Sequence, residues 1–234
     1  MILGGTDPAA NQQGTSLVSL TLYMHPLASF CQKVADRVHE NDTPFEPRIV
    51  DLDDVASRAE FLKIWPIGRM PVLRDEARDQ TIPESSIIIE YLAQHYPGKM
   101  QLVPTDTDFA RQTRLQDRFY DLYVQEPMQK IVTDRLRPGG KNDPHGVEQA
   151  RGLLQAAYGM IEHDMSTKTW AMGDAFSMAD CAAAPALFYA DLVLPFGDTY
   201  PSIAAYLRRL MEPPSFARVV RDAEPYRALF PKKD

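Results

Sequence analysis

Hydrophobic and polar positions along the first hundred residues switch repeatedly between two periodicities. Short runs rich in β-branched and aromatic residues predict strands at 17–23, 45–52, 70–73 and 81–82. Apolar residues that recur at helical spacing predict helices at 30–39, 57–64 and 84–95. Proline, alone or with glycine, follows each predicted helix and ends it. The expected order of elements is therefore β-α-β-α-β-β-α.

The pattern changes after residue 98. No further segment has a convincing strand pattern, and long helical periodicities predict helices at 109–124, 147–163, 178–192 and 203–211. We therefore expect an α/β domain over 19–98 and an all-helical domain over 108–234, joined by a linker at 99–107. Residues 1–18 are rich in small and polar side chains, and we expect them to form a flexible tail.

Composition narrows the class of protein. Hydrophobic residues make up 44% of the 234 positions and charged residues 24%, as in a globular protein with a sizeable core. The formal net charge of -7 argues against a general nucleic-acid binder, which needs basic residues to neutralise phosphates. The five histidines lack the spacing of metal ligands, so we expect no metal.

The sequence also indicates a compartment. Its two cysteines, Cys31 and Cys181, lie far apart and form no CxxC pair, which favours a reducing environment. No apolar run approaches the roughly 20 residues of a membrane helix. The N-terminus lacks the charged start and apolar core of a signal peptide. We therefore expect a cytoplasmic protein with no membrane partner.

Three short motifs stand at defined places in this pattern. G-R-M-P-V-L at 68–73 puts a proline at the start of a predicted strand. P-E-S-S at 83–86 opens the third predicted helix, where serine and glutamate are common capping residues. S-M-A-D at 177–180 has the spacing of a capping box before an apolar helix.

The order of elements and the three motifs together resemble the cytosolic glutathione transferase family, in particular serine-type bacterial members similar to the theta, phi and zeta classes. The resemblance implies a thioredoxin-like N-terminal domain that binds glutathione and a C-terminal helical bundle. It implies that Pro71 is cis and that the backbone of Met70 binds the cysteinyl part of glutathione. Arg69 would reach a glutathione carboxylate, and Glu84 and Ser85 would hold the γ-glutamyl end.

The residue that activates glutathione is expected where the first strand meets the first helix. A free thiol has a pKa of about 8.5, so the family must favour the thiolate at neutral pH. Ser29 is our candidate, although omega- and tau-like members place their residue one position earlier, at Ala28 in this chain. Three alternatives stay open: Ser29 only caps the helix, Cys31 acts as a nucleophile in thiol–disulfide exchange, or Tyr23 is the activating residue.

The second substrate is expected to lie against the helical domain. The aromatic residues Phe119, Tyr120 and Tyr123 are candidates for its pocket, with core packing as the alternative. Three arginines, at 111, 114 and 118, share one helical side, which favours a solvated or interdomain salt-bridging face.

The resemblance implies an enzyme that conjugates glutathione to an electrophilic apolar small molecule, in detoxification, and acts as a homodimer. The alternatives are a glutathione-dependent isomerase, dehalogenase or thiol–disulfide reductase, and a non-catalytic interaction module. The presence of the whole glutathione-binding set together favours an enzyme.

Overall fold

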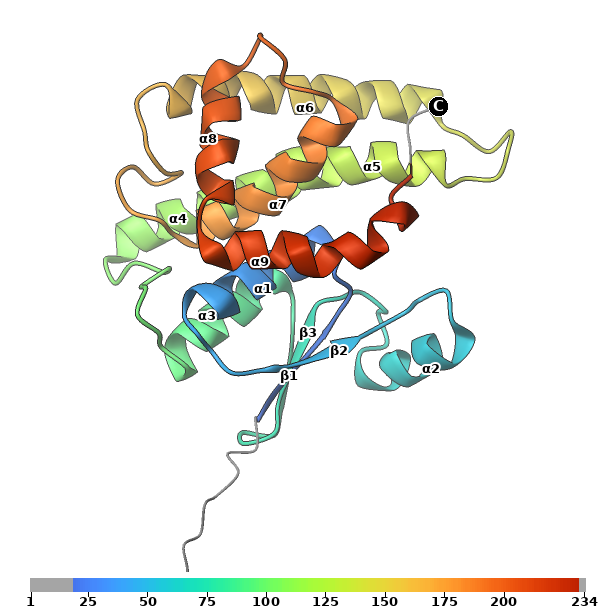
Figure 1. Cartoon of the computed structure of the whole chain (residues 1–234), viewed down its shortest axis with the longest axis vertical. Helices are drawn as coiled ribbons and strands as arrows, with labels where there is room; N and C mark the ends of the chain where they lie inside the picture. The colour runs from blue at the N-terminus through green and yellow to red at the C-terminus, as the bar shows by residue number, and fades with distance from the viewer. Residues whose placement is uncertain (1–18, 232–234) are drawn as a thin grey trace, which may run out of the picture.

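The computed structural model describes residues 19–231, so the tail expected at 1–18 lies outside the described residues. Four strands form one mixed sheet (Figure 1): β1 (Leu20–Met24), β2 (Glu46–Ile49), β3 (Val72–Asp75) and β4 (Gln80–Pro83). Their order across the sheet is β2-β1-β3-β4. β1 runs parallel to β2 and antiparallel to β3, and β3 runs antiparallel to β4.

Helices cover both faces of this sheet. They are α1 (Ser29–Glu40), α2 (Val55–Ile64) and α3 (Ser85–His95). Leu20 and Leu22 of β1 are buried in the main core with α1 and α3. Tyr23, which points to the opposite face because side chains alternate along a strand, packs with Phe61 of α2. The thioredoxin-like order of elements predicted from the sequence is confirmed.

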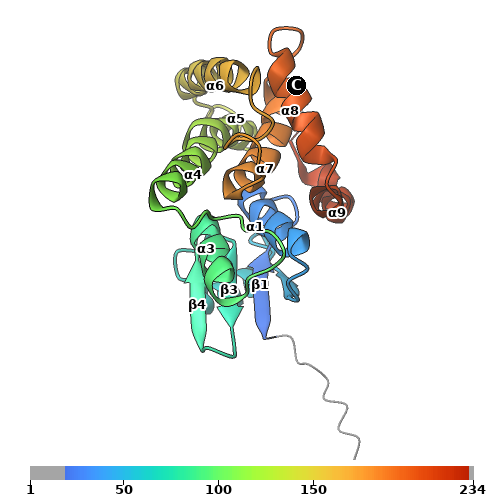
Figure 2. The same cartoon turned by 90° about the vertical axis from the view of Figure 1, so that its left-hand side faces the viewer.

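The helical domain stands on the α1 side of the sheet domain (Figure 2). It consists of α4 (Thr107–Phe119), a π-helical segment η1 (Tyr120–Gln125), α5 (Glu126–Arg135), α6 (Pro144–Met165), α7 (Met178–Val193), α8 (Pro201–Met211), α9 (Pro214–Ala223) and the 3-10 segment η2 (Glu224–Leu229). α7 is the central helix, since nearly all of its side chains are buried, and it packs against α1, α4 and η1.

The helix predicted at 109–124 is longer than expected. It begins at Thr107, passes through η1 and continues as α5 to Arg135. Pro127 is the physical reason for the difference. Proline has no N–H to donate to the preceding turn, so the sequence predicts an end here, whereas the chain widens locally into a π-helix and carries on.

The C-terminal helices α9 and η2 were also not predicted. Both have proline in their first turn, at Pro214 and Pro225, and proline in a predicted helix usually signals its end. The first helical position nevertheless accepts proline, because its N–H would have no partner in the helix. η2 contributes to the wall of the larger cavity described below, and α9 to the wall of a second, smaller one.

The capping box at the start of α7 is confirmed. Asp180 accepts a hydrogen bond from the backbone N–H of Ser177 at 2.8 Å, and the Ser177 hydroxyl accepts one from the N–H of Ala179. Asp180 also accepts from the Tyr206 hydroxyl at 2.6 Å and the Ala171 N–H at 2.8 Å. The box therefore fixes α8 and the loop before α7 as well as the helix start.

Among residues 19–231, no helix combines the length and the apolar character needed to cross a bilayer.

Candidate functional site

A cavity of about 670 Å³ lies where the two domains meet. Its sheet-domain side comes from the β1–α1 junction, the β2–α2 loop and the segment before β3. Its helical side comes from the end of η1, from α5 and from η2. Polar and charged residues gather on the sheet-domain side, including His25, Ser29, Asp51, Asp53 and Arg69. Apolar residues dominate the helical side, including Met128, Val132, Leu229 and Phe230.

Ser29 lies in this cavity at the start of α1. It is the first residue of the helix, and only 7% of its surface is exposed. The N-cap position belongs to Ala28, which has extended backbone angles and no side chain that caps the helix. The interpretation that Ser29 merely caps α1 is therefore wrong. The uncapped amides and the helix dipole leave this end of α1 open to an anionic group.

Arg69 and Met70 line the same cavity from the segment before β3. Arg69 is exposed and Met70 is half-buried. The Met70–Pro71 peptide bond is cis, as predicted. The structure thus brings the G-R-M-P motif to the cavity that holds Ser29, although some 40 residues separate them in the sequence.

Glu84 and Ser85 do not line the cavity, and the pairing of β3 with β4 shows where Glu84 lies relative to the G-R-M-P motif. Val72 pairs with Pro83 across β3 and β4, so the chain places Glu84 beside Pro71 at the end of this strand pair. Glu84 occupies the N-cap position of α3 with a φ of 69°, and its side chain makes no capping hydrogen bond to the helix. A non-glycine residue in this left-handed region costs about 1–3 kcal/mol, and such residues concentrate at ligand sites.

Cys31 does not fit the role of nucleophile. It is fully buried and lies outside the cavity. Burial raises the pKa of its thiol to about 12, so the group is a neutral thiol at physiological pH. Tyr23 is half-buried against Phe61, with 6.2 Å between ring centroids, and it also lies away from the cavity.

The aromatic residues expected in the second-substrate pocket lie elsewhere. Phe119 packs against the core, Tyr120 is buried within it, and Tyr123 is 44% exposed on the surface. The helical wall of the cavity instead begins at Gln125 and continues with Met128 and Val132 of α5. The residues that reach the cavity therefore come after the aromatic ones along the chain, from the end of η1 and from α5.

Gln125, which the sequence did not single out, is the last residue of η1 and lines the cavity. Only 4% of its surface is exposed, and its Oε1 has no hydrogen-bond partner among the described residues. Buried carbonyl oxygens are normally paired, so this atom offers an acceptor to a ligand. Proximity to a π-helical turn is a feature shared by many functional residues, but nothing in the sequence pattern reveals such a turn.

His25 is a second lining residue with a defined hydrogen-bond role. Its Nδ1 accepts from the backbone N–H of Leu27 at 3.2 Å, which leaves Nε2 as the protonated nitrogen of the neutral ring. Burial lowers the pKa of His25 and favours that neutral form. The ring meets Tyr226 of η2 edge-on, with 5.0 Å between centroids. His25 therefore ties the C-terminal segment to the β1–α1 junction.

A buried charged cluster lies behind the start of α3. Lys33 of α1 donates to the Ser86 hydroxyl at 2.8 Å and forms ion pairs with Asp117 and Asp121 of the helical domain. Arg118 contacts the same two carboxylates. This cluster locks the two domains together next to the P-E-S-S motif.

The arginine row on α4 has the salt-bridging role that its spacing indicates. Arg114 pairs with Glu90 of α3 through two hydrogen bonds of 2.7 and 2.8 Å, across the domain boundary. Arg111 pairs with Asp108 within α4. Over the range 19–231, no three histidine, cysteine or acidic side chains stand close enough together to hold a metal ion.

The fold and the site define a class: a thioredoxin-like domain with a cis-proline motif, joined to a helical domain, with the cavity between them. Residues 22–100 match the family model described as the glutathione S-transferase N-terminal domain. Residues 144–209 match the model of the glutathione S-transferase C-terminal domain. The chain belongs to the glutathione S-transferase family.

Individual relatives are distant but span most of the chain. Glutathione S-transferase GstB of Escherichia coli K12 is 23% identical over 203 residues, 86% of this chain and 97% of the relative. Dichloromethane dehalogenase of Methylorubrum extorquens is 27% identical over 221 residues, which are 84% of this chain and 72% of the relative. A glutathione S-transferase from Methylobacillus flagellatus, solved with glutathione bound, has a TM-score of 0.79 at 24% identity, covering 86% and 98% of the two chains.

Proposed function

We propose that this protein is a glutathione transferase that joins the sulfur of glutathione to an electrophilic, apolar small molecule. The observation that carries the proposal is the cavity itself. It sets Ser29 at an uncapped helix start, with Arg69 and Met70 beside it, against an apolar wall from the helical domain. Family membership and the glutathione bound to a structural neighbour support the choice of thiol.

Glutathione would occupy the sheet-domain side. In this proposal the Ser29 hydroxyl donates a hydrogen bond to the sulfur, and the dipole of α1 adds to the stabilisation of the thiolate. Arg69 pairs with a carboxylate of glutathione. The γ-glutamyl end extends to the start of α3, where backbone amides face its carboxylate and Glu84 faces its ammonium group. The strained backbone of Glu84 supports a ligand-binding role for that position.

The acceptor would occupy the helical side. Met128, Val132 and Phe230 offer apolar contacts, and Gln125 offers one buried acceptor oxygen. The glutathione thiolate attacks an electrophilic carbon of the acceptor, a carbon–sulfur bond forms, and the leaving group departs with its electron pair. The thiol proton is released to solvent when the thiolate forms. Burial of the acceptor beside the sulfur holds the reacting atoms together.

A turnover assay tests the role of Ser29. Wild type and Ser29→Ala are compared with glutathione and a chloro-nitroaromatic acceptor, with Ser166→Ala at the exposed end of α6 as the matched control. Loss of a hydrogen bond to the thiolate should lower kcat/KM by about 10²- to 10³-fold while the Kd for glutathione is retained. Unchanged turnover in Ser29→Ala would assign thiolate activation to another group.

We also propose a homodimer that uses the outer surface of α3, α4 and η1. Large apolar side chains are exposed there, with Ile87 54%, Leu115 62% and Tyr123 44% exposed. Charged substitution within a dimer interface should shift the protein to monomer. Leu115→Asp is therefore expected to halve the mass measured by light scattering, whereas Leu136→Asp, an equally exposed leucine after α5, should leave it unchanged.

A further inference from the structure

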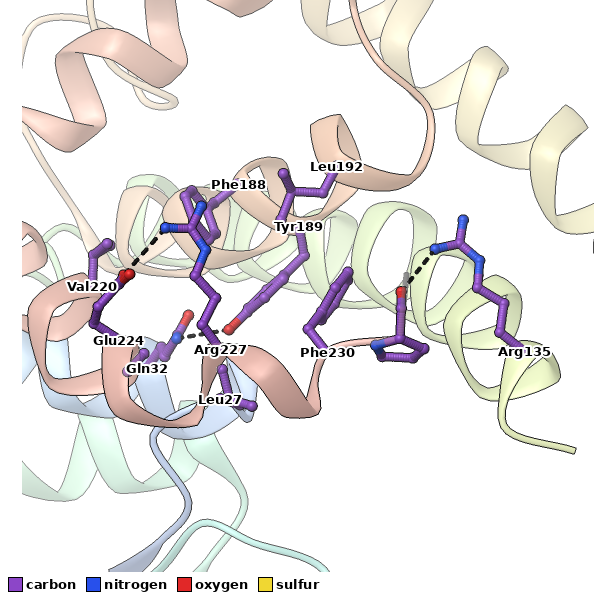
Figure 3. Close-up of a pocket in the computed structure, with 12 residues that line it drawn as sticks. Leu27, Gln32, Arg135, Phe188, Tyr189, Leu192, Val220, Glu224, Arg227 and Phe230 are labelled. Carbon is purple, nitrogen blue, oxygen red and sulfur yellow. Dashed lines mark hydrogen bonds and ion pairs between the residues drawn. The ribbon is translucent and has the colours of Figure 1, made fainter. Parts of the chain in front are cut away.

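A second cavity, of about 310 Å³, adjoins the first and shares Leu27 and Pro231 with it, among other residues. Figure 3 shows the residues that line this second cavity. Its lining residues come from α1, α5, α7, α9 and η2 and from the segments next to α1 and η2. Tyr189 of α7 and Phe230 stack with 5.4 Å between centroids and 19° between planes. These two rings line both cavities and form part of the partition between them. None of the glutathione-binding candidates lines the second cavity.

The walls of the second cavity are apolar. Phe188 and Leu192 come from α7, and Val220 and Ala223 come from α9. The charged residues that line it have partners in the protein: Arg227 pairs with Glu224 at 3.1 Å, and the half-buried Arg135 of α5 donates to the Pro231 carbonyl at 3.3 Å. The interior therefore favours an uncharged ligand with apolar surface.

One polar group reaches the floor of this cavity. Gln32 of α1 is 1% exposed, and its Nε2 donates to the Pro26 carbonyl at 2.8 Å and to the Tyr189 hydroxyl at 2.9 Å. The Pro26 carbonyl can only accept, so the NH2 end of the amide must face it and the amide orientation is fixed. Gln32 Oε1 then points into the cavity and has no hydrogen-bond partner among residues 19–231 (Figure 3).

Tyr189 adds a donor beside this acceptor. Its oxygen accepts from Gln32, and none of the described residues accepts its hydroxyl hydrogen. Burial raises the pKa of Tyr189 to about 12, so the hydrogen is present at neutral pH. An unpaired buried acceptor and a free hydroxyl hydrogen thus lie next to each other, beside the apolar side chains of α7 and α9. One hydroxyl group can satisfy both, since it donates and accepts at once.

We propose that this second cavity binds neutral aromatic molecules that carry a hydroxyl group, the phenol class. The ligand hydroxyl donates to Gln32 Oε1 and accepts from the Tyr189 hydroxyl, while its ring packs against Phe188, Leu192 and Val220. A carboxylate is disfavoured because its oxygens would face the Gln32 carbonyl oxygen, and an ammonium group is disfavoured by the cost of its burial. This site is distinct from the proposed glutathione cavity and does not depend on that function.

The test uses 2-naphthol as the probe and the full-length protein. Binding is measured by calorimetry, with 2-methoxynaphthalene as the matched compound that has the ring but no hydroxyl hydrogen. We expect 2-naphthol to bind at least about tenfold more tightly, because the methoxy compound leaves Gln32 Oε1 unpaired. Equal affinity for the two compounds would overturn the proposal.

Two half-buried valines locate the site. Val220 lines only the second cavity and Val132 only the first, so Val220→Trp should abolish 2-naphthol binding while Val132→Trp retains it. Thermal unfolding establishes that both variants are folded. Gln32→Met, which keeps the shape of the side chain, should remove the preference for 2-naphthol. Loss of binding in Val132→Trp alone, or no binding of 2-naphthol to wild type, would refute the second site, whatever the affinity for glutathione.

Discussion

Lys33 Nζ lies 2.6 Å from Asp117 Oδ1, and each of these side chains is only 1% exposed. The pair joins α1 of the sheet domain to α4 of the helical domain. Lys33 also bonds Ser86, the neighbour of Ser85 at the start of α3. The position of the proposed γ-glutamyl site therefore depends on a buried charge that spans the two domains.

Removal of this lysine charge should destabilise the protein strongly. Lys33→Met keeps the length of the side chain but removes the positive charge that neutralises the buried carboxylates of Asp117 and Asp121. Breaking a buried pair costs about 3–5 kcal/mol, so we expect a loss of that order in the free energy of unfolding, measured by urea denaturation. Lys99→Met, which removes an exposed pair with Asp42, is the control and should have little effect. Equal small losses would show that the cluster does not hold the domains together.

The contribution of Asp36 to the free energy of unfolding should fall as pH rises. Its carboxyl group is fully buried among Ser215 and Cys181, with Glu40 and Asp180 nearby, and burial raises its pKa to about 7. The folded state therefore holds this proton more tightly than the unfolded chain. The stabilisation that this bound proton gives the folded state is complete below about pH 4, declines between about pH 4 and pH 7, and is lost above about pH 7.

Asp36→Asn, a neutral side chain of the same shape, isolates this effect. Other carboxyl groups, such as those of Asp75 and Glu162, have lowered pKa values and act in the opposite sense, so the quantity to compare is the difference between variant and wild type. That difference should favour the variant increasingly from pH 4 to pH 7, by up to about 4 kcal/mol. Exposed Asp42→Asn is the control. A constant difference across this pH range would contradict the assignment.

Both cysteines should be unreactive towards alkylating reagents in the folded protein. Cys31 and Cys181 are free thiols with no exposed surface, and burial raises the pKa of each. Iodoacetamide at pH 8 is expected to label neither in the native state and both in urea, as counted by mass spectrometry. Rapid native labelling of Cys31 would instead favour a thiol–disulfide reductase.

The sequence was informative wherever a local pattern determines structure. The alternation of strands and helices and the Ser177–Asp180 capping box each depend on residues close together in the chain, and each was predicted from its pattern. The cis bond before Pro71 was expected from the family resemblance. The junction that carries Ser29 was also identified, because a strand followed by a proline-containing loop and a helix has a clear signature.

Features that depend on tertiary contacts could not be predicted. The π-helical turn before Pro127 is stabilised by packing against α7 and leaves no signature in hydrophobic spacing. Gln125 at the end of this turn lines the cavity, whereas Tyr120 at its start is buried in the core. The contribution of Tyr226 and Phe230 was missed as well, because it requires the short C-terminal segment to fold back over α1.

The most direct test of the proposed function is a calorimetric measurement of glutathione binding. Wild type is compared with Glu84→Gln, which removes the charge but keeps the side-chain shape, and with Glu148→Gln on the exposed surface of α6 as the control. We predict that wild type and the control bind alike and that Glu84→Gln binds at least about tenfold more weakly, since it loses the ionic contact with the glutathione ammonium group. Absence of binding to wild type at millimolar glutathione would contradict the proposal that this family member uses glutathione.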